Sequence, residues 1–273
     1  MPYTGELIAI ATVLCWTVSV QFFEAASKKV GASPVNIIRL TSALTFFSIL
    51  MLIRHGTILP FHFPVSAWAY LGLSGMVGFF MGDIFLFKAL VEIGPRVAML
   101  IFSLSAPTAA LIEWIFLGQS YTWLQWTGIF ITISGVSIVI LEKSIPENSN
   151  ASMNIRQISL KGILFAFGGM LGQAVGYILS KTGMQLETAY LDAFDATQIR
   201  AFAAFICFII FFTLTGKWGD LRMALYNRRA VAFTVTGSAI GPFLGVSLSL
   251  LVLHYLSAGV ASTFLSLVPV FII

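Results

Sequence analysis

The sequence has few charged residues and almost no cysteine. Only 10% of its residues are charged, 2 of 273 are cysteine, and 58% are hydrophobic. This shortage of charge leaves too little polar surface to coat a water-soluble globule, so the composition indicates a membrane protein. Cys15 and Cys207 lie far apart within apolar runs, without the spacing of a metal site or a redox pair. We therefore expect both cysteines to serve only in helix packing.

The sequence also lacks the signatures of enzymes and of nucleic-acid binding. No Gly-rich phosphate loop precedes a helix, no Ser, His and acidic residue are placed to act together, and no Cys or His pair has metal-ligand spacing. The formal charge of +4 is spread over short loops and is not gathered in a basic patch. We expect no enzymatic activity, no cofactor, no metal and no nucleic-acid partner.

Long apolar runs are abundant in this sequence. Runs of about 20 mostly apolar residues are long enough to cross a bilayer as helices. They lie at residues 6–27, 35–53, 66–92, 96–117, 121–141, 160–182, 195–214, 230–255 and 259–273. The third and fourth runs are separated only by the hinge Gly94-Pro95-Arg96. The sequence thus predicts an all-α polytopic membrane protein with nine helices present.

The two halves of the chain resemble each other. A polar, turn-rich linker at residues 143–159 separates residues 1–142 from residues 160–273. Corresponding positions are Ser27-Lys28 and Ser180-Lys181, Arg39 and Arg200, Gly78 and Gly241, Gly82 and Gly245, Phe102 and Phe264, and Pro107 and Pro269. Because the first half holds five spans, the second enters the membrane from the opposite side. This pattern predicts two inverted five-helix repeats, which are typical of transporters.

The last apolar run is short. Residues 259–273 give about 22 Å of helix, against a hydrocarbon core of about 30 Å. The corresponding helix of the first repeat continues through Leu117-Gly118-Gln119 and is followed by a fifth span. We therefore expect that a complete second repeat would add a turn and a tenth helix after Ile273.

Short motifs rich in glycine, alanine and proline occur in both halves, in matching order. They are Gly82-Asp83, Ala89-Leu90, Gly94, Pro107, Leu117-Gly118, Gly128 and Gly135 in the first half, and Gly241-Pro242-Phe243-Leu244-Gly245, Ala258-Gly259-Val260-Ala261-Ser262 and Pro269 in the second. In this set the sequence resembles the drug/metabolite transporter superfamily, specifically its EamA-type ten-helix members. The family commonly has Glu where this chain has Gln119. The resemblance implies a transporter of small organic solutes, often an exporter.

Small residues at four-residue spacing form stripes on three predicted helices. Such stripes let helix backbones approach closely in lipid. The stripes contain Gly78 and Gly82, Gly172 and Gly176, and Gly241 and Gly245. We expect these glycines, together with Pro107 and Pro269, to act in helix packing, and the first and third stripes to form the moving seam of a transporter. Direct solute contact is the alternative for the glycines.

Asp83 is the candidate that stands out, because it lies past the middle of its span, where an ionised carboxylate is costly and must face protein or water. Contact with the solute or a coupling proton is one interpretation, and a bond to another helix is the other. Arg39 and Arg200 lie about one turn inside the second helix of each repeat. They are candidates for solute binding, with anchoring at the headgroup level as the alternative.

Uncharged polar and aromatic residues within the spans are further candidates. Trp16, Gln21, Gln173 and Tyr177 would line a cavity, or else form hydrogen bonds between helices. Glu24 precedes Lys28 by four residues, which predicts a local ion pair near the end of the first helix.

The orientation in the membrane is left open by two opposing arguments. Ten lysines and arginines follow odd-numbered spans and only Arg54 and Lys181 follow even-numbered ones, so the positive-inside rule places the N-terminus outside the cytoplasm. The family resemblance implies a cytoplasmic N-terminus.

The functional hypothesis is a secondary transporter, possibly an exporter, in a cell membrane of the bacterial inner-membrane type. It would move small organic solutes or metabolites by alternating access, with the lipid bilayer and the solute as partners and a homodimer as a possible assembly. The alternative is a membrane-embedded scaffold or a non-functional fragment of such a transporter.

Overall fold

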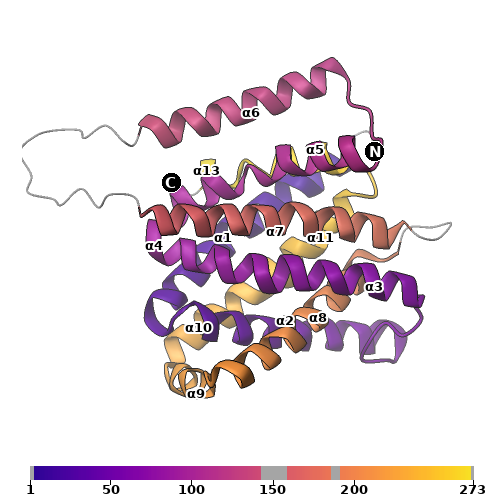
Figure 1. The fold of residues 1–273 in the computed structure, drawn as a ribbon. Coiled ribbons are helices and arrows are strands. Elements are labelled where there is room, and N and C mark those ends of the chain that lie inside the picture. Colours follow the sequence, from indigo (N-terminus) through magenta and orange to yellow (C-terminus); the bar gives the residue numbers. More distant parts are fainter. Residues whose placement is uncertain (1–2, 143–158, 186–190, 272–273) are drawn as a thin grey trace, which may run out of the picture.

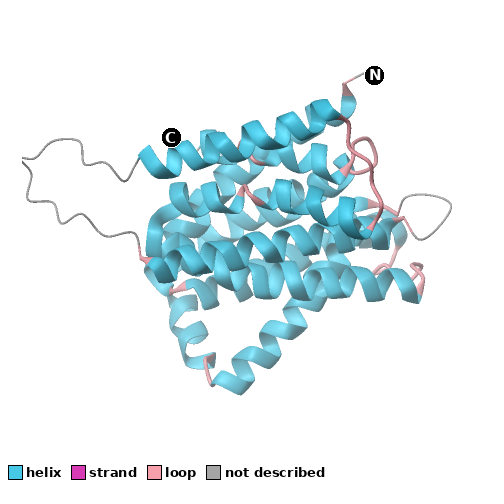
Figure 2. Cartoon of the chain, turned by 45° about the horizontal axis from the view of Figure 1, so that its top comes forward, coloured by secondary structure: helices cyan, strands magenta, loops and turns pink. Residues whose placement is uncertain are grey.

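The computed structural model describes residues 3–142, 159–185 and 191–271, and within these ranges every regular element is a helix (Figures 1 and 2). The first half contains α1 (Thr4–Val30), α2 (Ala32–His55), α3 (Val65–Ser74), the π-helix η1 (Gly75–Gly82), α4 (Asp83–Phe102), α5 (Ser105–Phe116) and α6 (Trp123–Glu142). The second contains α7 (Leu160–Met184), α8 (Ala193–Thr215), α9 (Trp218–Tyr226), α10 (Arg228–Ser238), the π-helix η2 (Ala239–Val246), α11 (Ser247–Val252), α12 (Ala258–Leu265) and α13 (Val268–Phe271).

The helices have the length and surface of a membrane bundle. Among the described residues, five helical runs are long and apolar enough to cross a bilayer: Thr4–Val30, Ala32–His55, Leu160–Met184, Ala193–Thr215 and Arg228–Val252. Large apolar side chains on their outer faces are exposed, for example Leu7, Leu14 and Val18 on α1. Water would disfavour so much exposed apolar surface, whereas lipid does not. The chain is a multi-pass membrane protein.

Three breaks interrupt the helices of the predicted runs. α4 is interrupted at Gly94, whose φ of 79° suits glycine, and this confirms the predicted hinge. The predicted run 96–117 is broken by a turn at Ser103–Leu104, and the run 259–273 is broken at Ser266–Leu267. Pro107 and Pro269 each lie in the first turn of the helix that follows the break, where a missing N–H costs little. The prediction of unbroken helices was wrong at these two positions, and it also missed the short helix α9.

Both π-helices occupy corresponding places in the two repeats. η1 carries Gly75, Gly78 and Gly82, while η2 carries Gly241, Pro242 and Gly245. Pro242 removes a backbone donor within η2, but η1 has no proline, so proline alone does not explain the wider helix. Such π-segments are rare and are frequent at functional sites.

The stripes of small residues join helices of different repeats. The stripe on η1 packs on α7, and a methyl group added at Gly172 would lie 2.7 Å from Cα of Gly82. A methyl group at Gly176 would lie 3.1 Å from Cα of Gly78, and Ser74 Oγ donates to the Gly176 carbonyl over 2.6 Å. We call this contact the η1–α7 seam. Figure 1 shows α7 running beside α3 and α4.

The corresponding seam of the second repeat joins η2 to α1. Here the glycines face side chains: an added methyl group at Gly241 would lie 2.8 Å from Cβ of Ser19, and one at Gly245 would lie 2.7 Å from Cδ1 of Trp16. We call this contact the η2–α1 seam. α1 and α7 start their respective repeats, so the two seams are related by the internal duplication.

Candidate functional site

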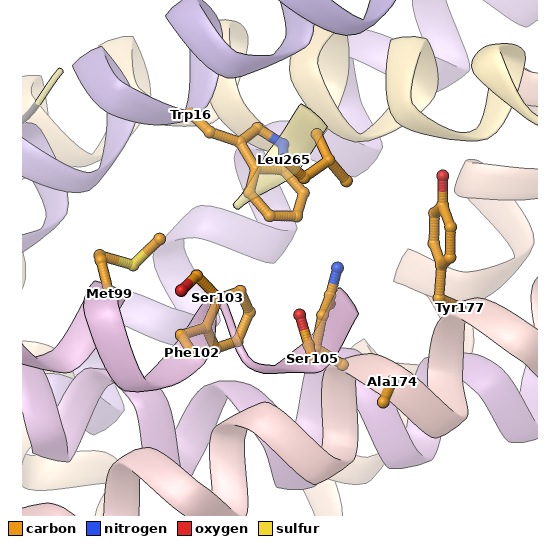
Figure 3. Close-up of a pocket in the computed structure, with 9 residues that line it drawn as sticks. Trp16, Met99, Phe102, Ser103, Ser105, Ala174, Tyr177 and Leu265 are labelled. Carbon is orange, nitrogen blue, oxygen red and sulfur yellow. The ribbon is translucent and has the colours of Figure 1, made fainter. Parts of the chain in front are cut away.

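Two adjoining cavities lie where the two repeats meet. The smaller is lined by Trp16, Met99, Phe102, Ser103, Ser105, Gln173, Ala174, Tyr177 and Leu265 (Figure 3). The larger is lined by Trp16, Ser19, Val20, Phe23, Arg39, Phe79, Asp83, Leu86, Phe87, Leu90, Met99, Phe102, Gln173, Gly241, Pro242 and Val246. Trp16 and Gln173 line both cavities, so residues from both repeats converge here. The two helix breaks also adjoin the smaller cavity, because Phe102, Ser103 and Leu265 lie beside them.

The charged centre of the larger cavity is an ion pair between Asp83 and Arg39. Asp83 begins α4 directly after η1, and its carboxylate accepts a hydrogen bond from Nη2 of Arg39 on α2. The side chain of Arg39 is 5% exposed and that of Asp83 is 14% exposed. Each charge thus compensates the cost of burying the other, which is the condition for keeping a carboxylate at this depth. The structure gives Asp83 both a bond to another helix and a place at the cavity.

Both predicted arginines are buried within the bundle. Arg200 is 1% exposed, and its Cζ lies 4.4 Å from the ring centroid of Phe79, while Cζ of Arg39 lies 5.7 Å from the same centroid. Two guanidinium groups therefore pack against one aromatic ring, which contributes cation–π attraction. Anchoring at the headgroup level, the alternative for Arg39 and Arg200, is wrong because neither side chain reaches the surface of the bundle.

Two polar groups at the cavities are left without partners. Nε1 of Trp16 is buried, and no described residue forms a hydrogen bond with it. The side-chain amide of Gln173 likewise forms no hydrogen bond within the described part of the chain. Tyr177 differs, because its hydroxyl donates to the Ser249 carbonyl over 2.8 Å while its ring lines the smaller cavity. Figure 3 shows Trp16 and Tyr177 across the cavity from each other. Unsatisfied polar groups of this kind call for a water or solute partner.

Gln21 lies apart from the other candidates. Its side chain is exposed on α1 and lines neither cavity. Ser19, two residues earlier, faces the larger cavity, and a step of two residues turns an α-helix by about 200°. Gln21 therefore points away from the site, and we do not retain it as a candidate. Ser19 and Phe79 take places that the sequence analysis did not assign.

A second buried charged cluster lies at one end of the bundle. Glu113 on α5 is fully buried, and it pairs with Nζ of Lys181 on α7 at 2.5 Å. The hydroxyl of Tyr121, in the turn before α6, donates to the same carboxylate over 2.5 Å. The sequence analysis missed this cluster, although the repeat aligns Lys181 with Lys28.

No group of His, Cys, Asp and Glu suited to a metal ion occurs among the described residues. The predicted pair between Glu24 and Lys28 is confirmed as an ion pair one turn apart on α1. The chemistry available at the centre is therefore that of binding: a charged pair, unsatisfied donors and aromatic walls.

Comparison with known proteins agrees with this architecture. The model of the EamA-like transporter family matches residues 3–141 and 160–273. A solved structure, titled only as the crystal structure of a protein, superposes with a TM-score of 0.55 at 16% identity, covering 100% of this chain and 98% of that one. At that identity the likeness shows the fold alone. No curated protein matches the chain. Because the family model covers both repeats, this chain belongs to the EamA-like transporter family of membrane transporters, which are not enzymes.

Proposed function

We propose that this transporter exports a small organic solute across the cell membrane as a secondary transporter, by alternating access through the two adjoining cavities. The observation that carries the proposal is the buried indole donor without a partner, Nε1 of Trp16, which lies with the half-buried amide of Gln173 at the junction of both cavities. A solute that offers an acceptor there would satisfy a buried donor that otherwise lowers stability, and the amide of Gln173 could bond the same solute. Such partially satisfied sites are typical of ligand pockets.

The lining of the larger cavity indicates how a solute would be held. Phe23, Phe87 and Phe102 supply aromatic walls, and the Asp83–Arg39 pair supplies charge of both signs. A flat apolar body would pack against the rings, while a polar group would reach the charged pair. Asp83 is our first candidate for the polar contact or the proton-coupling group.

The size of the cavities supports a change of conformation. The space open to the centre of a water molecule is about 60 Å³ in the larger cavity and about 10 Å³ in the smaller. One water needs about 10–15 Å³ by this measure. The larger cavity therefore holds a few waters and not a metabolite. Transport requires it to widen toward one side of the membrane at a time, as alternating access provides.

A growth assay tests the proposal. Cells that overproduce the protein are grown against toxic concentrations of amino acids, nucleosides and amines, and resistance to one class identifies an exported solute. Val246→Phe fills the larger cavity from η2, so this variant should lose the resistance. Leu244→Phe is the matched control, because Leu244 is 41% exposed on the outer face of the same π-helix. Equal growth of parent and Val246→Phe on every solute would favour a scaffold or a non-functional fragment.

A further inference from the structure

The two repeat-related arginines differ in their partners. Arg39 is paired with Asp83, whereas no carboxylate of the described residues lies within ion-pair distance of Arg200. Nε is buried without a hydrogen bond in both arginines, but Arg39 donates to Asp83 from Nη2, whereas the guanidinium of Arg200 forms no hydrogen bond with the described chain. A guanidinium that is only 1% exposed is costly without an anionic partner. The conformation described above therefore does not explain why the unpaired guanidinium of Arg200 is buried.

Arg200 lies close to Asp83, the one carboxylate among the described residues that line the larger cavity. Its guanidinium packs on Phe79, four residues before Asp83, and Arg39 packs on the same ring. Asp83 lies within electrostatic reach of both arginines. The ring of Phe79 thus contacts two cations, one of which is paired with Asp83. Its attraction to the Arg200 guanidinium offsets part of the burial cost in the present arrangement.

The π-helix η1 connects this aspartate to Arg200. The backbone N–H of Asp83 donates to the Gly78 carbonyl, five residues earlier, which is the π-type hydrogen bond. A methyl group added at Gly78 would lie 3.4 Å from Nη2 of Arg200. The guanidinium therefore lies against the turn that ends in Asp83. Any conversion of this turn between i→i+5 and i→i+4 hydrogen bonding would rotate Asp83 relative to both arginines.

The second repeat has no carboxylate at the position that corresponds to Asp83. Val246 follows Gly245 as Asp83 follows Gly82, so the first repeat has an acid at this position and the second does not. In transporters built from inverted repeats, one repeat rocks against the other to open the opposite side. We propose that Asp83 exchanges partners in this movement, from Arg39 in the conformation described above to Arg200 in the opposite-facing one. Arg200 is then a positioning residue that sets the balance between the two states, an inference that rests on the proposed function.

The test measures access to the site from each side of the membrane without a known solute. A single cysteine is introduced as Ser103→Cys in a background that carries Cys15→Ala and Cys207→Ala. Ser103 is buried and lines the smaller cavity. Right-side-out and inside-out vesicles are treated with a membrane-impermeant maleimide, and the labelling rates from the two sides are compared. The parent should be labelled from both sides.

Opposite shifts in the two arginine variants are the expected result. Arg200→Gln should favour the state that has the Asp83–Arg39 pair, and Arg39→Gln should favour the other state. Each should change the ratio of labelling rates by about 5- to 150-fold, in opposite directions. Adding Asp83→Asn to each variant should abolish the difference between them. Shifts in the same direction, or unchanged ratios in a parent labelled from both sides, would overturn the exchange. A parent labelled from one side only would overturn the proposed function and the exchange together.

Two further variants separate this role from a loss of folding. Arg200→Lys keeps the charge and should restore most of the parent ratio. Val246→Asp adds a carboxylate to the second repeat at the position that corresponds to Asp83; if it pairs with Arg200, Asp83 should stay with Arg39 and the ratio should shift as in Arg200→Gln. Val246→Asn is the control, because asparagine matches aspartate in size and polarity but carries no charge. If Val246→Asp and Val246→Asn give the same ratio, Arg200 is not a partner of Asp83.

Discussion

The η1–α7 seam and the η2–α1 seam descend from one internal duplication but have become different contacts. In the η1–α7 seam, glycine backbones meet glycine backbones, as at Gly82 and Gly172. In the η2–α1 seam, Gly241 and Gly245 meet Ser19 and Trp16 instead. The larger cavity is lined by those α1 side chains and by η2. The duplicated glycine stripes therefore provide the helix packing, and the larger cavity lies at the seam where the two copies differ.

The corresponding basic residues of the two repeats also differ in their partners. Arg39 has Asp83 as its partner, while the second repeat has Val246 at the position that corresponds to Asp83. Lys28 pairs with Glu24 on its own helix, whereas Lys181 reaches Glu113 on α5 of the other repeat. In each case the basic residue of the first repeat has an acidic partner within its own repeat. Among the described residues, the basic residue of the second repeat has no such partner within its own repeat, and substitutions at both positions can measure that difference.

The largest effect is expected from breaking the buried pair of the first repeat. Asp83→Asn leaves Arg39 charged and unpaired, so we expect a loss of stability of about 3–5 kcal/mol. The thermal unfolding midpoint of purified protein in a single detergent measures it. The double variant Asp83→Asn with Arg39→Gln should recover part of the loss, because no lone charge remains. A double variant as unstable as the sum of both single variants would show that the two side chains act independently.

Glu113→Gln tests the pair that crosses between repeats. The change removes the charge that holds Lys181, whose side chain is 13% exposed, while it keeps an acceptor for Tyr121. We expect a loss of about 1.5–3 kcal/mol, the usual range for a hydrogen bond to a charged group. The same unfolding assay applies. Tyr121→Phe is the companion variant: if it costs more than Glu113→Gln, the phenol and not the lysine is the main partner of the carboxylate.

Gly172→Ala and Gly245→Ala compare the two seams directly. The added methyl group meets the backbone of Gly82 in the first variant and the side chain of Trp16 in the second. A backbone within a packed helix pair cannot move aside, so Gly172→Ala should cost about 1–3 kcal/mol. Trp16 borders the cavities and can turn into that space, so Gly245→Ala should cost less and reduce the cavity instead. Equal losses in unfolding assays would contradict the difference between the seams.

The sequence predicted the scaffold well because its signals are local. Apolar runs, the linker and repeated motifs specified the bundle, and Gly94 and the Glu24–Lys28 pair lie where the local pattern placed them. The sequence also identified Asp83 as a residue that needs a partner, since depth in the membrane is visible from its span.

The partners themselves depend on packing between distant helices. Nothing in the local pattern of α2 shows that Arg39 meets Asp83, or that Arg39 and Arg200 both pack on the ring of Phe79. Gln21 was misassigned because the polarity of the residues on α1 does not show which face of the helix points inward. Trp16 and Ser19 face inward, whereas Gln21 does not. The helix breaks were missed for a related reason, since apolar side chains continue across the turn at Ser103–Leu104.

The smallest effect is expected at the lysine that has a partner on its own helix. The side chain of Lys28 is 58% exposed, and an exposed pair one turn apart on a helix contributes about 0.3–0.5 kcal/mol. Glu24→Gln should lower the unfolding midpoint only slightly, and the difference from the parent should vanish at about 1 M salt, where the screening length is about 3 Å. Glu113→Gln, assayed in parallel, should keep most of its effect in salt because that carboxylate is fully buried. If the two variants respond alike to salt, the surroundings of the two corresponding lysines do not differ as the structure shows.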